Sequence, residues 1–314
     1  MLGNILGKVL LLGMVTALVS CSPTESSLQL EPTIEPALTS EAKGVITLGE
    51  VSNKPTKKIK RFGPMADYLA ANLSQFGIGV GEVKIAPDLN TITTWLESGE
   101  VDIYFDSPYP AMIVSDKSGA EPILRRWKYG QAEYFGVFLA MKKQGITSLS
   151  ELQGKMIAFE KPISTSGYFL PLVLLRENGL NPVEKSSPDQ PVAADEVGYI
   201  FSDDDENTIQ WVISGRVAAG AADISTFRSI PESSRESITV LAETEKVSRH
   251  LVLLREGIEP EKAEAIKNLL LGMDKTPEGK EVLQKFEKTA KFEELPKEVE
   301  LERMGKLYKL LKER

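Results

Sequence analysis

Short apolar runs alternate with amphipathic segments along most of this chain. The predicted strands are Gly44–Val51, Val80–Ala86, Val101–Phe105, Phe135–Met141, Met156–Phe159, Gly198–Phe201, Val217–Ala222, Val240–Leu241 and Leu251–Leu254. The predicted helices are Pro64–Leu73, Asn90–Glu97, Tyr168–Asn178, Asn207–Ile213, Glu261–Met273, Pro277–Lys288 and Lys297–Leu311, with a helical turn at Leu149–Leu152. Because strands and helices alternate with short connections, the pattern predicts an α/β fold with mostly parallel sheets.

The turn that precedes the helix at Tyr168 is rich in hydroxyl groups. It consists of Ser164, Thr165, Ser166 and Gly167. Backbone N–H groups are unpaired at a helix start, and the positive end of the helix dipole lies there. Together with three hydroxyls, these groups predict a seat for a small anion that needs no fixed positive charge. The alternative is that the hydroxyls only cap the helix, as Ser and Thr commonly do.

Polar loops follow three of the predicted strands. They are Asp106–Tyr109, Ile163–Gly167 and Ser202–Asn207. In open α/β sheets, ligands bind beyond the carboxyl ends of the strands, where the next helices begin. We therefore expect a ligand cleft between two lobes, with the first loop facing the other two. The connections between the lobes should lie near Tyr129–Phe135 and Glu243–His250.

The amino terminus has the pattern of an exported lipoprotein. Residues 1–20 contain Lys8 and no acid, followed by an apolar run too short to span a bilayer comfortably. The residues Leu18–Cys21 (LVSC) resemble a bacterial lipobox, in which the chain is cut before the cysteine and the cysteine is lipidated. Cys21 is the only cysteine, so it cannot form an internal disulfide. The alternative is an ordinary signal peptide with an incidental cysteine.

Composition narrows the classes of partner. Residues 21–43 are rich in Ser, Thr, Pro and Glu without an apolar period, which predicts a disordered tether. The formal net charge is −8, and loss of Lys8 with the signal peptide makes it −9. This acidic balance argues against nucleic acid and against electrostatic binding to anionic lipid. Hydrophobic residues make up 42% of the chain, which is enough for substantial cores.

Several segments resemble the phosphonate/phosphite-type solute-binding proteins of ABC transporters. In chain order they are Lys60–Ala70 (KRFGPMADYLA), Ala86–Phe105, Ser148–Phe159 (SLSELQGKMIAF), the run STSGYFLP that begins at Ser164, and Glu206–Ala221. Several segments in the right order are much harder to meet by chance than one short motif. In that family the STSG turn grips an oxyanion.

The resemblance implies a two-lobe periplasmic-binding-protein fold of type II, a flytrap that closes around its ligand by hinge motion. It implies lobe I from residues 44–132 plus 245–314, and lobe II from residues 133–244. The implied function is delivery of a small anionic or zwitterionic solute to an ABC permease, by a monomeric lipoprotein anchored in the membrane and facing the periplasm or cell exterior. A ligand-sensing receptor with the same fold is the alternative. The resemblance implies no cofactor, metal or catalytic residue, and the sequence contains no P-loop or dinucleotide motif.

Three positions depart from the family pattern. Asp205 stands where the family has a histidine, Leu89 where it has an aromatic residue, and Asp106 where it often has a tyrosine. A carboxylate beside a dianion is costly unless it is protonated or paired. We therefore expect a ligand whose anionic end meets the STSG turn and whose amine or hydroxyl end meets Asp106 and Asp205.

Other side chains are further candidates. Glu206 and Asp223 can meet an amine, and Tyr109 can either wall the ligand or simply pack. The acid run at residues 203–206 can instead cap a helix start or bind a metal. His250, the only histidine, is expected to be structural, and Arg249 offers either a positive charge for the ligand or a surface ion pair.

Overall fold

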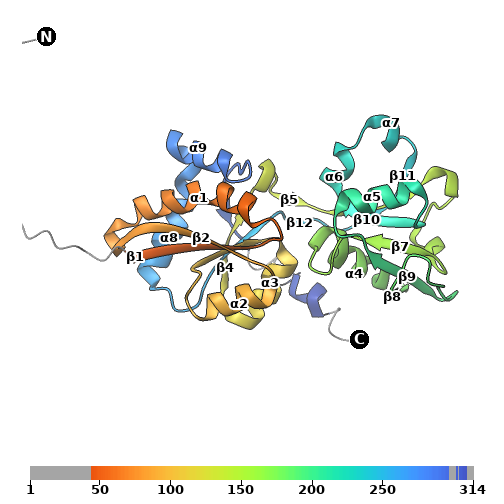
Figure 1. Ribbon diagram of the computed structural model, residues 1–314, viewed down its shortest axis with the longest axis horizontal. Coiled ribbons are helices and arrows are strands. Elements are labelled where there is room, and N and C mark those ends of the chain that lie inside the picture. Colours follow the sequence, from red (N-terminus) through yellow and green to blue (C-terminus); the bar gives the residue numbers. More distant parts are fainter. Residues whose placement is uncertain (1–43, 297–301, 303, 310–314) are drawn as a thin grey trace, which may run out of the picture. The chain divides into compact units, whose positions relative to one another are not determined.

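The computed structural model describes residues 44–296, 302 and 304–309. The predicted signal peptide, the tether and the lipobox residue Cys21 lie outside the described residues. The described chain forms two six-stranded sheets and one two-stranded sheet (Figure 1). We call each six-stranded sheet with its helices a lobe.

The first sheet has the strand order β14-β4-β13-β3-β1-β2. Its strands are β1 (Gly44–Val51), β2 (Ile78–Ala86), β3 (Ile103–Asp106), β4 (Glu121–Arg126), β13 (Leu251–Leu254) and β14 (Phe292–Glu294). Its helices are α1 (Pro55–Asn72), η1 (Ser74–Phe76), α2 (Leu89–Glu97), α3 (Pro108–Ser118), η2 (Lys128–Gly130), α8 (Pro260–Gly272), η6 (Met273–Lys275) and α9 (Pro277–Lys285). Strand β1 pairs in parallel with β2 and β3, whereas the pairs that involve β13, β4 and β14 are antiparallel.

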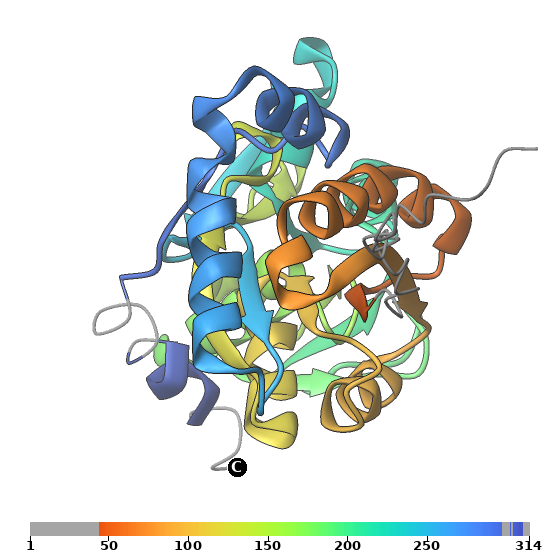
Figure 2. The ribbon, with the colours of Figure 1, turned by 90° about the vertical axis from the view of Figure 1, so that its left-hand side faces the viewer.

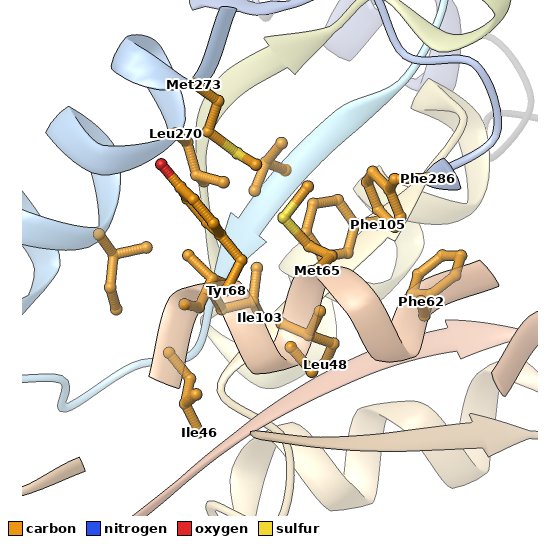
Figure 3. Close-up of a cluster of buried hydrophobic side chains, with 14 of the residues drawn as sticks. Ile46, Leu48, Phe62, Met65, Tyr68, Ile103, Phe105, Leu270, Met273 and Phe286 are labelled. Atoms are coloured by element: carbon orange, nitrogen blue, oxygen red, sulfur yellow. The ribbon is translucent and has the colours of Figure 1, made fainter. Parts of the chain in front are cut away.

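The core of the first lobe lies on both faces of this sheet. On one face, α1, α8 and α9 bury side chains such as Met65, Leu270 and Phe286 against the strands (Figures 2 and 3). The rings of Phe62, Phe105 and Phe286 meet edge to face within this cluster, which is a favourable geometry for aromatic pairs. On the other face, α2 and α3 pack against the opposite side chains of the same strands.

The second sheet has the strand order β11-β6-β10-β7-β9-β8. Its strands are β6 (Gly136–Met141), β7 (Met156–Phe159), β8 (Asn181–Glu184), β9 (Glu196–Phe201), β10 (Ala219–Asp223) and β11 (Ile238–Glu243). Its helices are η3 (Lys142–Gln144), η4 (Leu149–Leu152), the π-helical turn η5 (Thr165–Phe169), α4 (Leu170–Glu177), α5 (Asp205–Ser214), α6 (Ile224–Ser229) and α7 (Glu232–Arg235).

Strand β6 shows why the second sheet is covered on both faces. Val137 and Leu139 pack with the cluster under α5, whereas Phe138 and Ala140 pack with the cluster under α4. Side chains of a strand alternate between faces, so an entirely apolar strand requires helices on both sides.

The chain crosses between the lobes twice. It leaves the first sheet after β4 and enters the second at β6, and it returns between β11 and β13. The two crossings pair with each other as the short antiparallel strands β5 (Glu133–Tyr134) and β12 (Val247–Ser248). The lobe limits that we expected, at residues 133 and 245, fall in these connections.

The sheets differ from the prediction of mostly parallel pairing. Five strand pairs in the two large sheets are parallel and five are antiparallel. The reason is that the first strand after each crossing, β6 in the second sheet and β13 in the first, runs against both of its neighbours, and β14 adds one more antiparallel pair. Among the helices of the described residues, none is long and apolar enough to cross a membrane.

Candidate functional site

A cavity of about 440 Å³ is lined by residues of both lobes. The first lobe contributes Glu50, Val51, Ser52, Asn53, Lys58, Pro87, Asp106, Ser107, Lys128 and Tyr129; the second contributes Glu160, Lys161, Ile163, Ser164, Thr165, Ser166, Asp205 and Asp223; the crossing segments contribute Tyr134, Arg249 and His250. Many of these residues lie at or just after the carboxyl ends of parallel strands. This is the position at which ligands bind in open α/β sheets.

The hydroxyl turn after β7 lies at this cavity, and its three hydroxyls have different partners. Ser164 is the N-cap of the helical turn, since its Oγ accepts a hydrogen bond from the amide of Gly167 at 2.9 Å. Thr165 Oγ1 accepts a hydrogen bond from the backbone amide of Tyr109 at 3.0 Å. None of the hydrogen bonds of the described residues involves the hydroxyl of Ser166, which lines the cavity. The turn therefore both caps a helix and faces the cavity.

Two glycines allow this turn to approach its neighbours closely. A Cβ at Gly136 would lie 2.1 Å from the carbonyl oxygen of Ser166, and a Cβ at Gly167 would lie 2.6 Å from Cβ of Glu160. Gly167 itself does not line the cavity, and its amide is used by Ser164. Gly167 thus shapes the turn. We had expected its amide to be free to bind an anion, but the amide donates to Ser164 instead.

Both predicted carboxylates, Asp106 and Asp205, line the cavity, together with Asp223 and Glu160. The hydroxyl of Tyr104 donates to Asp106 Oδ2 at 2.6 Å, and the amide of Ser107 donates to Oδ1 at 2.6 Å. These donors fix the orientation of the Asp106 carboxylate at the end of β3.

Asp205 is held against the end of β10. Its Oδ1 accepts a hydrogen bond from the amide of Asp223 at 3.1 Å, and its Oδ2 accepts from Thr226 Oγ1 at 3.3 Å. Burial, followed by the charges of Glu160 and Asp223, raises the pKa of Asp205 well above its ordinary value. The second lobe therefore buries one carboxylate beside two others, which disfavours the ionised form of Asp205.

Like Gly167, three further residues that the sequence pointed to do not line the cavity. Glu206 is exposed in the first turn of α5. The ring of Tyr109 stacks on Phe169 with centroids 4.4 Å apart, and burial raises the pKa of Tyr109 to about 12. Leu89 begins α2 and packs against the apolar cluster of that face. Of the two roles open to Tyr109, the structure shows packing.

The hydroxyl turn was expected to bind an anion without a fixed positive charge, but the cavity that it lines also contains cationic side chains. Lys58, Lys128, Lys161 and Arg249 line it. Arg249 lies over the ring of Tyr134 at 4.2 Å, and its Nη2 lies 3.6 Å from Asp223 Oδ2. Arg249 therefore offers a positive charge at the cavity that is already partly paired.

Behind Lys58 and Lys128 lies a buried ionic cluster centred on Glu287. Lys58 Nζ lies 2.5 Å from Glu50 Oε1 and 2.7 Å from Glu287 Oε1. Lys128 Nζ and Arg126 Nη2 lie 3.1 Å and 3.3 Å from Glu287 Oε2. Burial alone would raise the pKa of Glu287, but the charges of Lys128, Arg126 and Lys58 outweigh it and hold this pKa well below the ordinary value.

His250 takes part in the same cluster and is structural, as expected. Its Nε2 lies 3.2 Å from Lys128 Nζ. Burial, and then the charges of Lys128 and Arg126, lower the pKa of His250 well below its ordinary value, so the ring is neutral. Burial likewise lowers the pKa of Lys128 to about 8.

The place of these two lysines at the cavity was not predicted, because the secondary-structure elements that carry or precede them were not predicted. Lys58 lies in the first half of α1, which we expected to begin at Pro64 and which begins at Pro55. Lys128 follows β4, which was not predicted. Pro55 was the available signal, because proline is favoured in the first turn of a helix.

The acidic residues at the start of α5 cap that helix. Asp204 is the N-cap, and its carboxylate accepts a hydrogen bond from the amide of Asn207 at 2.7 Å. Within the described part of the chain, no group of three or more His, Cys, Asp or Glu side chains is arranged to hold a metal ion.

Comparison with known proteins identifies the family. The model of the family described as "ABC transporter, phosphonate, periplasmic substrate-binding protein" matches residues 48–298. A protein from Xanthomonas citri, solved bound to chloride ion and to ATP, is 26% identical with a TM-score of 0.78, and the match covers 84% of this chain and 95% of that chain.

Two more distant structures have the same fold. PhnD1 from Prochlorococcus marinus, in complex with methylphosphonate, is 17% identical with a TM-score of 0.64, over 86% of this chain and 99% of that chain. A binding protein component of an ABC phosphonate transporter from Pseudomonas aeruginosa is 19% identical with a TM-score of 0.61, over 85% and 86%. Because the family match spans most of the chain, this protein belongs to the periplasmic substrate-binding proteins of phosphonate ABC transporters, which are extracytoplasmic transport proteins and not enzymes.

Proposed function

We propose that this protein binds a zwitterionic, phosphonate-like solute and delivers it to an ABC permease. The observation that carries the proposal is the composition of one cavity, in which a Ser-Thr-Ser turn and several carboxylates meet. A ligand with an oxyanion at one end and an amine at the other complements both groups.

The oxyanion end would lie at the turn. Thr165 Oγ1 accepts a hydrogen bond from the Tyr109 amide, and its hydroxyl also interacts with the side chain of Tyr134, so it would turn from Tyr134 to donate to a ligand oxygen. Ser166 offers a second hydroxyl. Hydrogen bonds to a charged acceptor are stronger than neutral ones, so two hydroxyls can orient a phosphonate without a direct ion pair.

The amine end would lie among Asp106, Asp205 and Asp223. Burial, followed by the charges of Glu160 and Asp223, raises the pKa of Asp205, and a ligand ammonium would offset the repulsion among these carboxylates. A bare dianion would increase that repulsion. The neighbouring proteins support an anionic component of the ligand, because those solved with ligands hold chloride, ATP or methylphosphonate.

A thermal-shift screen tests this proposal. The solutes are 2-aminoethylphosphonate, methylphosphonate, phosphite and phosphate, at equal concentration and pH. A ligand that binds only the folded state raises the melting temperature in proportion to the logarithm of its saturation. We expect the largest shift with 2-aminoethylphosphonate, and the largest shift with phosphate or phosphite would contradict the proposal.

We further propose that the protein is anchored through Cys21, in the segment outside the described residues. The support is the lipobox pattern at Leu18–Cys21 and the extracytoplasmic location of the family. Metabolic labelling with a palmitate analogue should mark the wild-type protein and not the Cys21→Ala variant. Equal labelling of both proteins would reject the anchor.

A further inference from the structure

Lys58 and Lys128 both line the ligand cavity from the first lobe. Their side chains are 15% and 11% exposed, whereas Arg126 in the same cluster is fully buried and does not line the cavity. Arg126 is held entirely by protein groups, since it donates to Thr289 Oγ1 and to the carbonyl of Phe286 and lies 3.7 Å from the ring of Phe286. The cluster therefore has one purely structural cation and two cations that face the cavity.

Each of these lysines keeps one donor beyond its contacts with the protein. An ammonium group has three N–H donors. Lys58 uses two on Glu50 and Glu287. Lys128 uses one on His250 Nε2 and approaches Glu287 as an ion pair at 3.1 Å, so each lysine keeps at least one donor. His250 is neutral and accepts at Nε2, so it adds no charge to the cluster.

The charges of the cluster do not cancel. Four cations (Lys58, Arg61, Arg126 and Lys128) face two carboxylates (Glu50 and Glu287), which leaves an excess positive charge. Burial raises the pKa of Glu50 and lowers the pKa of Lys128 to about 8, so the two shifts act in opposite directions on the excess. Glu50 Oε2 lacks a hydrogen-bond partner within the described residues, so a protonated Glu50 would add a donor. An uncompensated buried charge is costly, and an anion in the cavity would remove that cost.

We propose that Lys58 and Lys128 form a second anion subsite, which binds a carboxylate or similar oxyanion carried by the same solute. This inference rests on the proposed function and extends it. The ligand class becomes a phosphonate with an amine and an additional anionic group. The hydroxyl turn binds the phosphonate, the carboxylates of the cavity bind the amine, and the lysine pair binds the additional group.

Calorimetry with two ligands tests the subsite without altering the protein. The ligands are 2-aminoethylphosphonate and 2-amino-3-phosphonopropionate, which differ by one carboxylate. Loss of a hydrogen bond to a charged group typically corresponds to about ten- to a hundredfold in affinity. We expect the wild-type protein to bind the carboxylate-bearing ligand tighter by about this factor.

Variants then locate the effect. Lys128→Met and Lys58→Met should each abolish most of the preference while 2-aminoethylphosphonate still binds. The matched control is Lys285→Met, because Lys285 is 55% exposed, pairs with Glu281 and does not line the cavity. The control should keep the wild-type preference, and circular dichroism verifies that each variant is folded.

The outcomes separate this inference from the proposed function. If 2-aminoethylphosphonate binds and the carboxylate adds no affinity in the wild-type protein, the second subsite is wrong and the proposed function stands. If the preference survives in both folded lysine variants, the subsite lies elsewhere and the inference is overturned. If neither ligand binds, both the inference and the proposed function are rejected.

Discussion

Neighbouring residues of the hydroxyl turn have separable roles. Ser164 accepts the amide of Gly167 and so caps the helical turn, whereas the hydroxyl of Ser166 faces the cavity without such a task. Ser164 therefore acts as a helix cap, whereas anion binding is the role that we propose for Ser166.

Ser166→Ala and Ser164→Ala form a matched pair of variants. We expect Ser166→Ala to weaken binding of 2-aminoethylphosphonate about ten- to a hundredfold, with almost unchanged thermal stability. Ser164→Ala removes a cap and should lower the free energy of unfolding by about 1 kcal/mol. Calorimetry and denaturant unfolding measure the two effects. If Ser166→Ala loses stability and keeps its affinity, the turn is only a cap.

The Asp205 carboxyl predicts a pH-dependent stability. Its pKa in the folded protein is raised by burial and by Glu160 and Asp223, so the folded state holds a proton that the unfolded state has lost. The contribution of this proton to the free energy of unfolding is present at acidic pH. It is lost as the pH rises from about 4 through the pKa that Asp205 has in the folded protein. Arg249, paired with Asp223, is the nearby positive charge and does not prevent this shift.

Asp205→Asn tests this linkage in the ligand-free protein. The melting temperature of the variant, relative to the wild type, should increase as the pH rises above about 4. A difference that stays constant across the pH range would show that Asp205 is already ionised in the folded protein. Asp189→Asn is a suitable control, since Asp189 is exposed and lies outside the cavity.

At the scale of elements, the sequence predicts the strands best. The limits of β1, β7 and β13 agree with the prediction, because short apolar runs bounded by polar residues leave little ambiguity. The first half of α1 was missed because Pro64 suggested a helix start, yet the helix continues through it. Strand β4 (EPILRR) was missed because its apolar core is short and its charges dominate the pattern.

These misses explain how much of the site could be predicted. The hydroxyl turn, Asp106 and Asp205 were found because each follows a strand that the pattern identifies. The lysines were not found, because their place at the cavity depends on pairing with Glu287, more than 150 residues away in the chain. The local hydrophobic periodicity of the sequence carries no information about a contact between residues so far apart in the chain.

The end of α9 carries a prediction on stability. Glu287 adopts a left-handed backbone conformation (φ 53°) and places a carboxylate, 1% exposed, among four cations. Glu287→Ala leaves those cations without their common partner and should cost about 3–5 kcal/mol of unfolding free energy. Glu281→Ala on the same helix removes only the exposed pair with Lys285 and should have almost no effect. Denaturant unfolding measures both, and equal losses would show that the cluster has no special role.

At the scale of the whole molecule, the site depends on both lobes. The crossing strands β5 and β12 connect them, and the bond from the Tyr109 amide to Thr165 Oγ1 joins α3 of the first lobe to the hydroxyl turn of the second. A ligand that contacts both lobes favours the conformation in which they lie close together.

Closure can be measured by small-angle X-ray scattering. Saturating 2-aminoethylphosphonate should reduce the radius of gyration, because hinge closure brings the lobes together. The Ser166→Ala variant at the same ligand concentration, below its expected saturation, should show a smaller change. An unchanged radius with a ligand proven to saturate the site would count against closure.

The central claim is that one cavity recognises an oxyanion and an amine on the same solute. Calorimetry that compares 2-aminoethylphosphonate with methylphosphonate, in the wild type and in Asp106→Asn, tests it most directly. We predict that the wild type binds the aminated ligand tighter by about ten- to a hundredfold, and that Asp106→Asn reduces this preference. Tightest binding of phosphate or methylphosphonate, with no improvement in Asp106→Asn, would contradict the claim.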